Sequence, residues 1–364
     1  MRNAPAIRCA PSAESGPGLQ TGHCLCAAGL LFLLCLPAAG ISEDWRPRSW
    51  GGRLAVGIEQ RTAASEEASD PDLGTGDGRF WYAEVEDARL SLQLWSQWKT
   101  RLAGRPMRIE ASYERMEWAR SPILGQDLFE LELRQGVSKR SLFELALAYT
   151  PQIYSRHRID KDALPGEPQF RPQARRELGA EIGWTHAWRS DFASRLFLDL
   201  TLRDESRWFE ERDCRRTGAG ASCEFPVGGI DLVPCYEYRV NRSRNEPDLG
   251  SDLSYREHLA ELRLRHSGAA LPGGPYRVEL ATRWKFRAYT TDDPEDDWRY
   301  GRREQIYSMT ARVSRPMGWL VPFVSLETYG RAAKTAVEEA FDEDDDADRT
   351  FFLLGVEWER DLSP

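Results

Sequence analysis

The sequence predicts an all-β fold, a single antiparallel transmembrane β-barrel of about 12 strands. Three observations predict it. Apolar and polar residues alternate with a period of two through most of the chain, many alternating segments run ten residues or more, and short and long connections follow one another in turn. After residue 40 no apolar run approaches the ~20 residues that a membrane-spanning helix needs.

The first 40 residues resemble a secretory signal peptide. Arg2 and Arg8 supply a basic region, residues 27–36 form an apolar core, and small residues lead up to Gly40, after which we expect cleavage. The alternative is a membrane anchor, which the shortness of the run and Pro37 disfavour. The predicted domains are a signal peptide over 1–40, a short periplasmic lead over 41–52 and an outer-membrane barrel over 53–362.

The alternation is clear in the segment 177–186, where Leu178, Ile182 and Trp184 share one face and glutamates and glycines occupy the other. An amphipathic strand fits a soluble sheet or a membrane barrel with a lipid face and a wet lumen. Length favours the barrel, because soluble strands average five or six residues and transmembrane strands need ~9–11. The predicted strands are 53–62, 80–98, 105–118, 126–137, 141–154, 175–188, 192–208, 254–267, 274–290, 302–315, 318–331 and 349–362.

The connections between these strands alternate in length, as in barrels with short periplasmic turns and long outer loops. The short connections are 99–104, 138–140, 189–191, 268–273 and 316–317, and the longer ones are 63–79, 119–125, 155–174, 209–253, 291–301 and 332–348. Several long loops are acidic, as in Asp342 to Asp346. Such clusters can bind divalent cations weakly, but no EF-hand spacing is present, and we expect neither a dedicated metal site nor a cofactor.

Tryptophan is abundant, with 13 residues in 364. Amphipathic rings prefer the interface between headgroups and hydrocarbon, so tryptophans at strand ends support a membrane barrel. Core positions in a soluble β-protein are the alternative for any single one. Those near predicted strand ends are Trp81, Trp98, Trp118, Trp188, Trp208, Trp298, Trp319 and Trp358.

Three cysteines follow the predicted signal peptide, Cys214, Cys223 and Cys235, all within the predicted long loop 209–253. In an oxidising compartment two of them should pair, and Cys214 with Cys223 is the predicted disulfide because these two flank a Gly/Ala turn. A zinc site is the alternative. The absence of a CxxC motif and of a nearby histidine disfavours it.

The inward-facing charges are unevenly distributed over the predicted barrel. Opposed charges across a narrow lumen would make a transverse field that sorts polar solutes, whereas mutual neutralisation would fill the lumen with salt bridges. Glu130, Glu132, Arg283, Lys285 and Arg287 should line the narrow region. The predicted acidic arc is Glu130, Glu132, Glu144, Glu177, Glu181 and Asp199, and the predicted basic arc is Arg263, Arg265, Arg277, Arg283, Lys285 and Arg287.

In pattern, the chain after residue 40 resembles Gram-negative outer-membrane barrels as a class. That resemblance implies a location in the bacterial outer membrane, with outer-membrane lipid, lipopolysaccharide, the barrel-assembly machinery and small polar solutes as partners. Such barrels usually end in a strand with a terminal Phe or Tyr, whereas this chain ends in Asp361-Leu362-Ser363-Pro364. The net charge of −9 argues against a nucleic-acid partner.

The predicted function is passive diffusion of small polar or charged solutes. The alternative is a non-conducting surface barrel that binds a partner through its outer loops, above all the 204–253 segment. A lipid-acting hydrolase is a third hypothesis. It is disfavoured because no GxSxG or HExxH motif is present and the histidines match no phospholipase motif, so no catalytic residue is predicted.

Overall fold

The computed structural model describes residues 47–61, 86–119, 125–159, 170–206, 212–244, 252–271, 274–291, 300–334 and 347–361. For 155–159 and 170–173 only the backbone is described. Within these ranges no helix is long and apolar enough to cross a membrane. The predicted signal peptide and most of the acidic loop residues lie outside the described residues.

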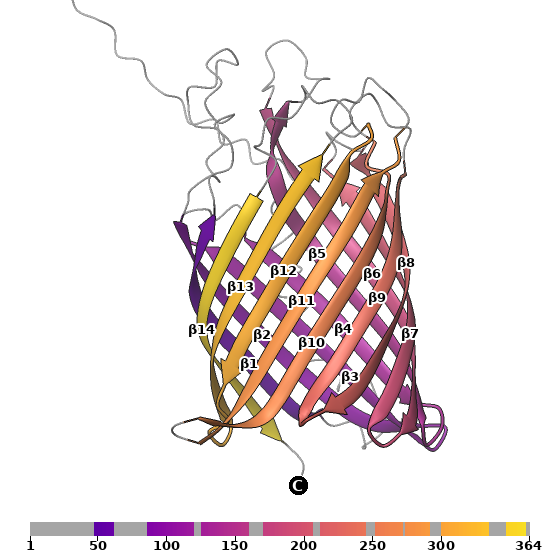
Figure 1. Cartoon of the computed structure of the whole chain (residues 1–364), viewed down its shortest axis with the longest axis vertical. Helices are drawn as coiled ribbons and strands as arrows, with labels where there is room; N and C mark the ends of the chain where they lie inside the picture. Colours follow the sequence, from indigo (N-terminus) through magenta and orange to yellow (C-terminus); the bar gives the residue numbers. More distant parts are fainter. Residues whose placement is uncertain are drawn as a thin grey trace, which may run out of the picture. The chain divides into compact units, whose positions relative to one another are not determined.

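Fourteen antiparallel strands close into one barrel, in which β1 pairs with both β2 and β14 (Figure 1). The strands are β1 (Pro47–Arg61), β2 (Glu86–Leu102), β3 (Arg105–Trp118), β4 (Gln126–Gly136), β5 (Ser141–Ile159), β6 (Phe170–Arg189), β7 (Phe192–Glu205), β8 (Cys214–Val227), β9 (Ile230–Ser243), β10 (Tyr255–Leu271), β11 (Gly274–Tyr289), β12 (Arg303–Ser314), β13 (Leu320–Lys334) and β14 (Ala347–Asp361).

The predicted barrel is confirmed, but the predicted number of 12 strands is wrong. The segment 209–253, predicted as one long loop, contains the β8–β9 hairpin. The period-two pattern is weak there, because the lipid-facing positions of β8 carry Thr217, Ala219 and Ala221 in place of large apolar residues. The first strand also begins at Pro47, inside the segment 41–52 that was predicted as a periplasmic lead.

Glycines on the lumen side of β8 explain why that strand lacks the usual alternation of large residues. A Cβ atom at Gly220 would collide with the ring of Phe197, and one at Gly218 would collide with the carboxylates of Asp199 and Glu237. These side chains come from the neighbouring strands β7 and β9. The glycines therefore make room for larger side chains beside them.

Tight turns join the strands at the end of the barrel that carries the C-terminus (Figure 1). Ala103 and Gly104 between β2 and β3 have φ of 51° and 74°, and Gly228 and Gly229 between β8 and β9 have φ of 58° and 84°. Two successive positive φ angles give the turn geometry that matches the twist of a two-residue hairpin. The strand ends that the longer connections join lie at the opposite end, which we call the loop end.

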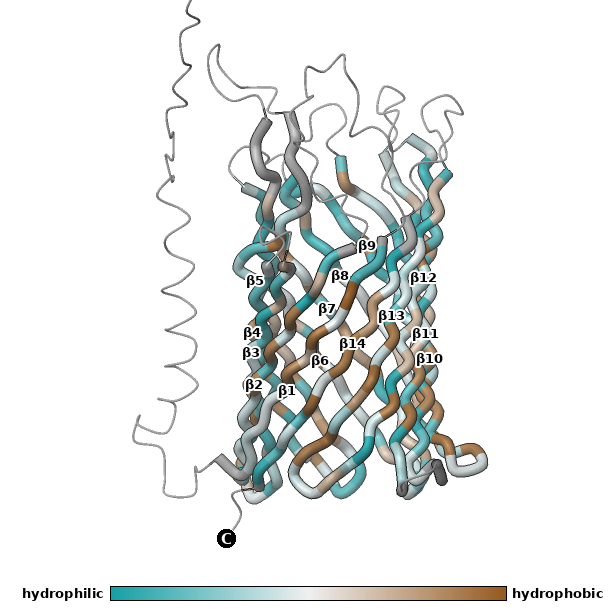
Figure 2. Tube along the Cα trace, turned by 90° about the vertical axis from the view of Figure 1, so that its left-hand side faces the viewer, coloured by the Kyte–Doolittle hydropathy of each residue, from teal (hydrophilic) through white to brown (hydrophobic). Residues whose placement is uncertain are grey.

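The outer wall is apolar through its middle. Leu196 and Leu198 are 64% and 62% exposed, respectively, and Ile58 is 60% exposed. Figure 2 shows hydrophobic residues recurring along the strands, while the loop-side strand ends are mainly hydrophilic. Of the tryptophans predicted at strand ends, Trp188 and Trp319 are exposed beside short turns, but Trp98 is buried. Large exposed apolar side chains on every part of a closed wall are stable only against lipid.

Candidate functional site: the barrel lumen

Charged side chains point into the barrel because each strand alternates lipid-facing and lumen-facing residues. Charged residues make up about half of the lining of each of three hollows inside the barrel. We call them the acidic, basic and mixed cavities after their charges. Arg263 and Arg265 line both the basic and the mixed cavity, and Glu132, Glu181 and Arg239 line both the acidic and the mixed cavity, so the three hollows adjoin.

The acidic cavity has a volume of about 320 Å³ and lies against strands β3 to β9. Five carboxylates and two guanidinium groups line it, so negative charge prevails. Ser112 donates a hydrogen bond to Glu130 with a distance of 3.0 Å, which holds that carboxylate at the wall. The charged lining residues are Glu110, Glu130, Glu132, Glu181, Asp199, Arg216 and Arg239.

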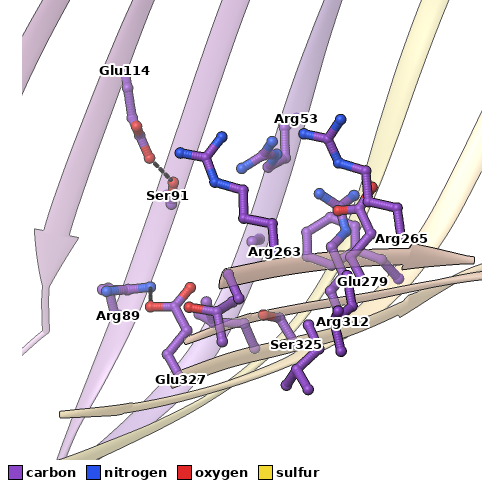
Figure 3. Close-up of a pocket in the computed structure, with 17 residues that line it drawn as sticks. Arg53, Arg89, Ser91, Glu114, Arg263, Arg265, Glu279, Arg312, Ser325 and Glu327 are labelled. Carbon is purple, nitrogen blue, oxygen red and sulfur yellow. Dashed lines mark hydrogen bonds and ion pairs between the residues drawn. The ribbon is translucent and has the colours of Figure 1, made fainter. Parts of the chain in front are cut away.

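The basic cavity has a volume of about 230 Å³ and is lined from both β1–β3 and β10–β14 (Figure 3). Five arginines and three glutamates line it, so positive charge prevails. Arg312 lies 4.0 Å from the centre of the Phe323 ring, and Arg53 lies 5.9 Å from the same centre. The charged lining residues are Arg53, Arg89, Arg263, Arg265, Arg312, Glu114, Glu279 and Glu327.

Most arginines of the basic cavity have a carboxylate partner. Arg53 and Arg312 both contact Glu357, each at 2.8 Å, and Arg89 lies 3.4 Å from Glu327. Arg265 differs, because no carboxylate among the described residues lies within ion-pair distance of it. Its guanidinium is therefore available to an anion that enters the lumen.

The mixed cavity is the largest, at about 520 Å³, and six arginines and six glutamates line it. Arg195 forms ion pairs with Glu144 and with Glu181, the latter at 2.5 Å. Arg283 contacts Glu261 at 2.6 Å. Opposite charges alternate along this part of the wall, so the mixed cavity has no excess of either sign.

Ion pairs inside the barrel run along the wall and do not cross the lumen. Among pairs that join two described side chains, the partners lie at most three strands apart around the barrel. The widest spacing is from Arg89 on β2 to Glu327 on β13. The charges therefore neutralise one another without joining opposite walls, and the wall pairs leave the middle of the lumen unbridged.

A buried ionic cluster lies toward the loop end of β10–β13. Glu304 is 1% exposed and accepts from Arg287 at 3.0 Å, Arg302 at 2.9 Å and Arg331 at 2.6 Å. Arg287 also contacts Glu257, at 2.9 Å. A buried carboxylate needs such partners because an uncompensated buried charge is strongly unfavourable.

The structure separates the predicted lumen residues into three groups. Glu130, Glu132, Glu144, Glu181, Asp199, Arg263, Arg265 and Arg283 line the cavities. Glu177 is held at the wall by Arg175 and Arg203, and Arg287 belongs to the buried cluster. Arg277 and Lys285 lie on β11, on the same face as Arg283, and line none of the three cavities.

Sequence reasoning missed several cavity residues. Arg53, Arg89 and Arg312 lie on β1, β2 and β12, where the same alternation marks them as lumen-facing. Arg216 and Arg239 lie on the β8–β9 hairpin, which was predicted as a loop. The signal for the first group was present in the alternation, whereas the second group required the two missed strands.

The predicted disulfide between Cys214 and Cys223 is wrong in this fold. Both residues lie on the single extended strand β8, so at ~3.3 Å per residue they are roughly 30 Å apart. A disulfide needs Cα atoms within about 7 Å. All three described cysteines are free thiols, and no group of metal-ligating side chains is present among the described residues.

Two described histidines on the outer wall have side-chain partners. The Nδ1 atom of His186 lies 2.9 Å from the Ser141 hydroxyl, and that of His258 lies 2.7 Å from the Tyr236 hydroxyl. A hydrolase needs a nucleophile, a base and a group that orients the base. Among the described residues, no further hydrogen bond orients the His186 ring beside Ser141.

No family model and no curated protein matches the sequence. Among solved structures, the chain is similar to the outer membrane channel DcaP of Acinetobacter baumannii, with 10% identity and a TM-score of 0.44 over 88% of this chain and 99% of that one. It is also similar to the TodX monoaromatic hydrocarbon channel deltaS2 mutant, with 5% identity and a TM-score of 0.43 over 87% of this chain and 91% of that one. Pseudomonas putida OprB is similar with 7% identity and a TM-score of 0.41 over 87% of this chain and 94% of that one.

The barrel itself defines the class of protein. An even number of antiparallel strands closes the sheet, the wall is apolar outside and charged inside, and tight turns at one end oppose longer connections at the other. These are the features of an integral β-barrel of the bacterial outer membrane. The short-turn end, which carries the C-terminus, is the periplasmic end in such barrels.

Proposed function

We propose that the barrel is a passive channel for small polar or charged solutes. The observation that carries the proposal is the direction of the ion pairs, which run along the wall and leave the three adjoining cavities between them. A barrel built to be filled would place pairs across its lumen. A charged and wet lumen suits hydrophilic solutes, because each lining group can replace part of a solute's hydration shell.

The unequal charge of the cavities supports selectivity by a transverse field. The carboxylates of the acidic cavity lie on β3, β4, β6 and β7, and the guanidinium groups of the basic cavity lie on β10, β12, β1 and β2. A solute with separated charges would be oriented by this field, and low-dielectric walls strengthen it. Arg265, which has no carboxylate partner among the described residues, is the group best placed to contact an anion.

The experiment is the conductance of single molecules of the purified protein in planar lipid bilayers. We expect discrete steps whose current is proportional to voltage, and a reversal potential in a salt gradient that reports the preferred ion. Absence of steps from a correctly folded barrel would contradict the channel.

The second candidate is a non-conducting barrel that binds a partner through its outer loops. The buried cluster around Glu304 favours it, because Glu304 and Glu257 are each only 1% exposed and the cluster occupies space toward the loop end. A folded barrel without conductance would support this function in place of the first.

A further inference from the structure

Five arginines gather on the outer wall where β6 to β10 reach the loop end, and we call them the outer arginine row. They lie on the lipid-facing side, since Arg256 is flanked by the buried residues Tyr255 and Glu257, and Arg215 follows the buried Cys214. All five are exposed. The members are Arg176, Arg215, Arg242, Arg244 and Arg256.

The row carries more positive charge than its acidic neighbours offset. Asp204 contacts both Arg176, at 2.9 Å, and Arg244. For the other three members, the described part of the chain holds no carboxylate within ion-pair distance. Within the described residues these three guanidinium groups therefore keep their capacity to bind an anion.

Two of the three stand directly opposite each other. Arg215 on β8 is the register partner of Arg242 on β9, and Arg256 on β10 faces Val240, two residues from Arg242 on the same strand. Like charges opposite each other on adjacent strands destabilise a sheet. An anion bound between them would turn this repulsion into a bidentate contact, for which arginine is well suited.

Directly below the row the wall carries polar aromatic groups before it becomes apolar. Tyr236 is 50% exposed and its hydroxyl lies 2.7 Å from Nδ1 of His258, whose ring lies 5.1 Å from that of Tyr238. His258 is two residues below Arg256 on the same strand. Tyrosine and histidine at this level fit the depth of lipid headgroups.

We propose that the outer arginine row binds the phosphate groups of lipopolysaccharide in the outer leaflet. The arginines supply the charge, the hydroxyl and imidazole groups below supply hydrogen bonds to the sugar, and the leucine-rich wall of β7 accommodates the acyl chains. The site lies on the outside of the barrel. It is therefore separate from the lumen and independent of conduction.

The test measures binding of lipid A with two phosphates to the purified protein in detergent, by native mass spectrometry or calorimetry. The variant is R215Q/R242Q/R256Q. The matched control is R105Q/R140Q/R360Q, which removes the same charge from exposed arginines near the short-turn end. We expect the first variant to bind at least tenfold more weakly and the control to bind within twofold of the unmodified protein.

A comparison that needs no variant uses dephosphorylated lipid A on the unmodified protein, for which we expect a similar loss. Equal binding of the two lipids, or equal binding by the two triple variants, would overturn the proposal. A change of oligomeric state in the R215Q/R242Q/R256Q variant without lipid would also overturn it, because the row would then be a contact between copies of the chain.

Discussion

At the scale of single residues, the lumen uses arginine in two ways. Arg287 is enclosed by carboxylates and fixes the wall, whereas Arg265 faces the cavities without a carboxylate partner among the described side chains. Sequence alternation predicted that both face the lumen. It could not distinguish their roles, because the pairing of Arg287 with Glu304 depends on the register between β11 and β12.

Substituting Arg265 with glutamate should shift ion selectivity toward cations. The change removes one positive charge and adds one negative charge where two cavities adjoin. In water, two unit charges at ~8 Å interact by about 0.5 kcal/mol, so a two-charge change amounts to about 1 kcal/mol, or about a fivefold change in permeability ratio. Reversal potentials in bilayers measure this, with R303E on the outer wall as control. An unchanged reversal potential would exclude Arg265 from the conduction path.

Replacing Glu304 with glutamine should destabilise the barrel. Three arginines would lose their shared carboxylate in a buried place, and breaking a buried ionic group in this way costs about 3–5 kcal/mol. Urea unfolding in lipid vesicles measures the loss. E327Q is the control, because Glu327 is partly exposed and has one long contact with Arg89, worth roughly 0–1 kcal/mol. Equal unfolding midpoints for the two variants would show that the cluster contributes little.

At the scale of elements, the strands with large apolar residues on alternate positions were predicted from the sequence and the β8–β9 hairpin was not. Alternation is visible only where a strand has bulky residues on its lipid face. In the middle of β8 the lumen face carries Gly218 and Gly220 and the lipid face carries small residues, so neither face gives a signal there. What decides the conformation of this strand is the fit of Phe197 and Asp199 from β7, which is a tertiary property.

A larger side chain at Gly220 should therefore destabilise the barrel. In G220V the added carbons would meet the Phe197 ring and the backbone of Tyr236, and such overpacking costs about 1–3 kcal/mol. The matched control is A219V, one residue away on the exposed outer face of the same strand. Urea unfolding and the electrophoretic shift on heating report folding. The expectation fails if the two variants are equally stable.

At the scale of the whole molecule, the fold class followed from strand length and from alternating connections. The exact strand number did not, because two missed strands joined by a short turn leave the number of strands even and the alternation of connections intact. The basic cavity combines residues from both ends of the chain, so it could be seen only after closure. The charge arcs inferred from the predicted strands between residues 126 and 290 were thus incomplete.

The chain should fold only in the presence of detergent micelles or lipid. Its apolar wall has no protein covering within the described residues, and water would expose side chains such as Leu196 and Leu198. We expect a heat-modifiable band in electrophoresis after dilution into micelles and none after dilution into buffer alone. A monomeric folded species in buffer would contradict the membrane barrel.

The carboxylate of Glu357 has a further consequence for how the barrel is completed. It lies on the last strand and contacts Arg53 of the first strand and Arg312 of β12, so it spans both sides of the seam. A slip of one residue in β14 would turn Glu357 toward lipid and leave both arginines without it. This one side chain therefore favours the native register of the final strand, because its two ion pairs with Arg53 and Arg312 are lost when β14 slips by one residue.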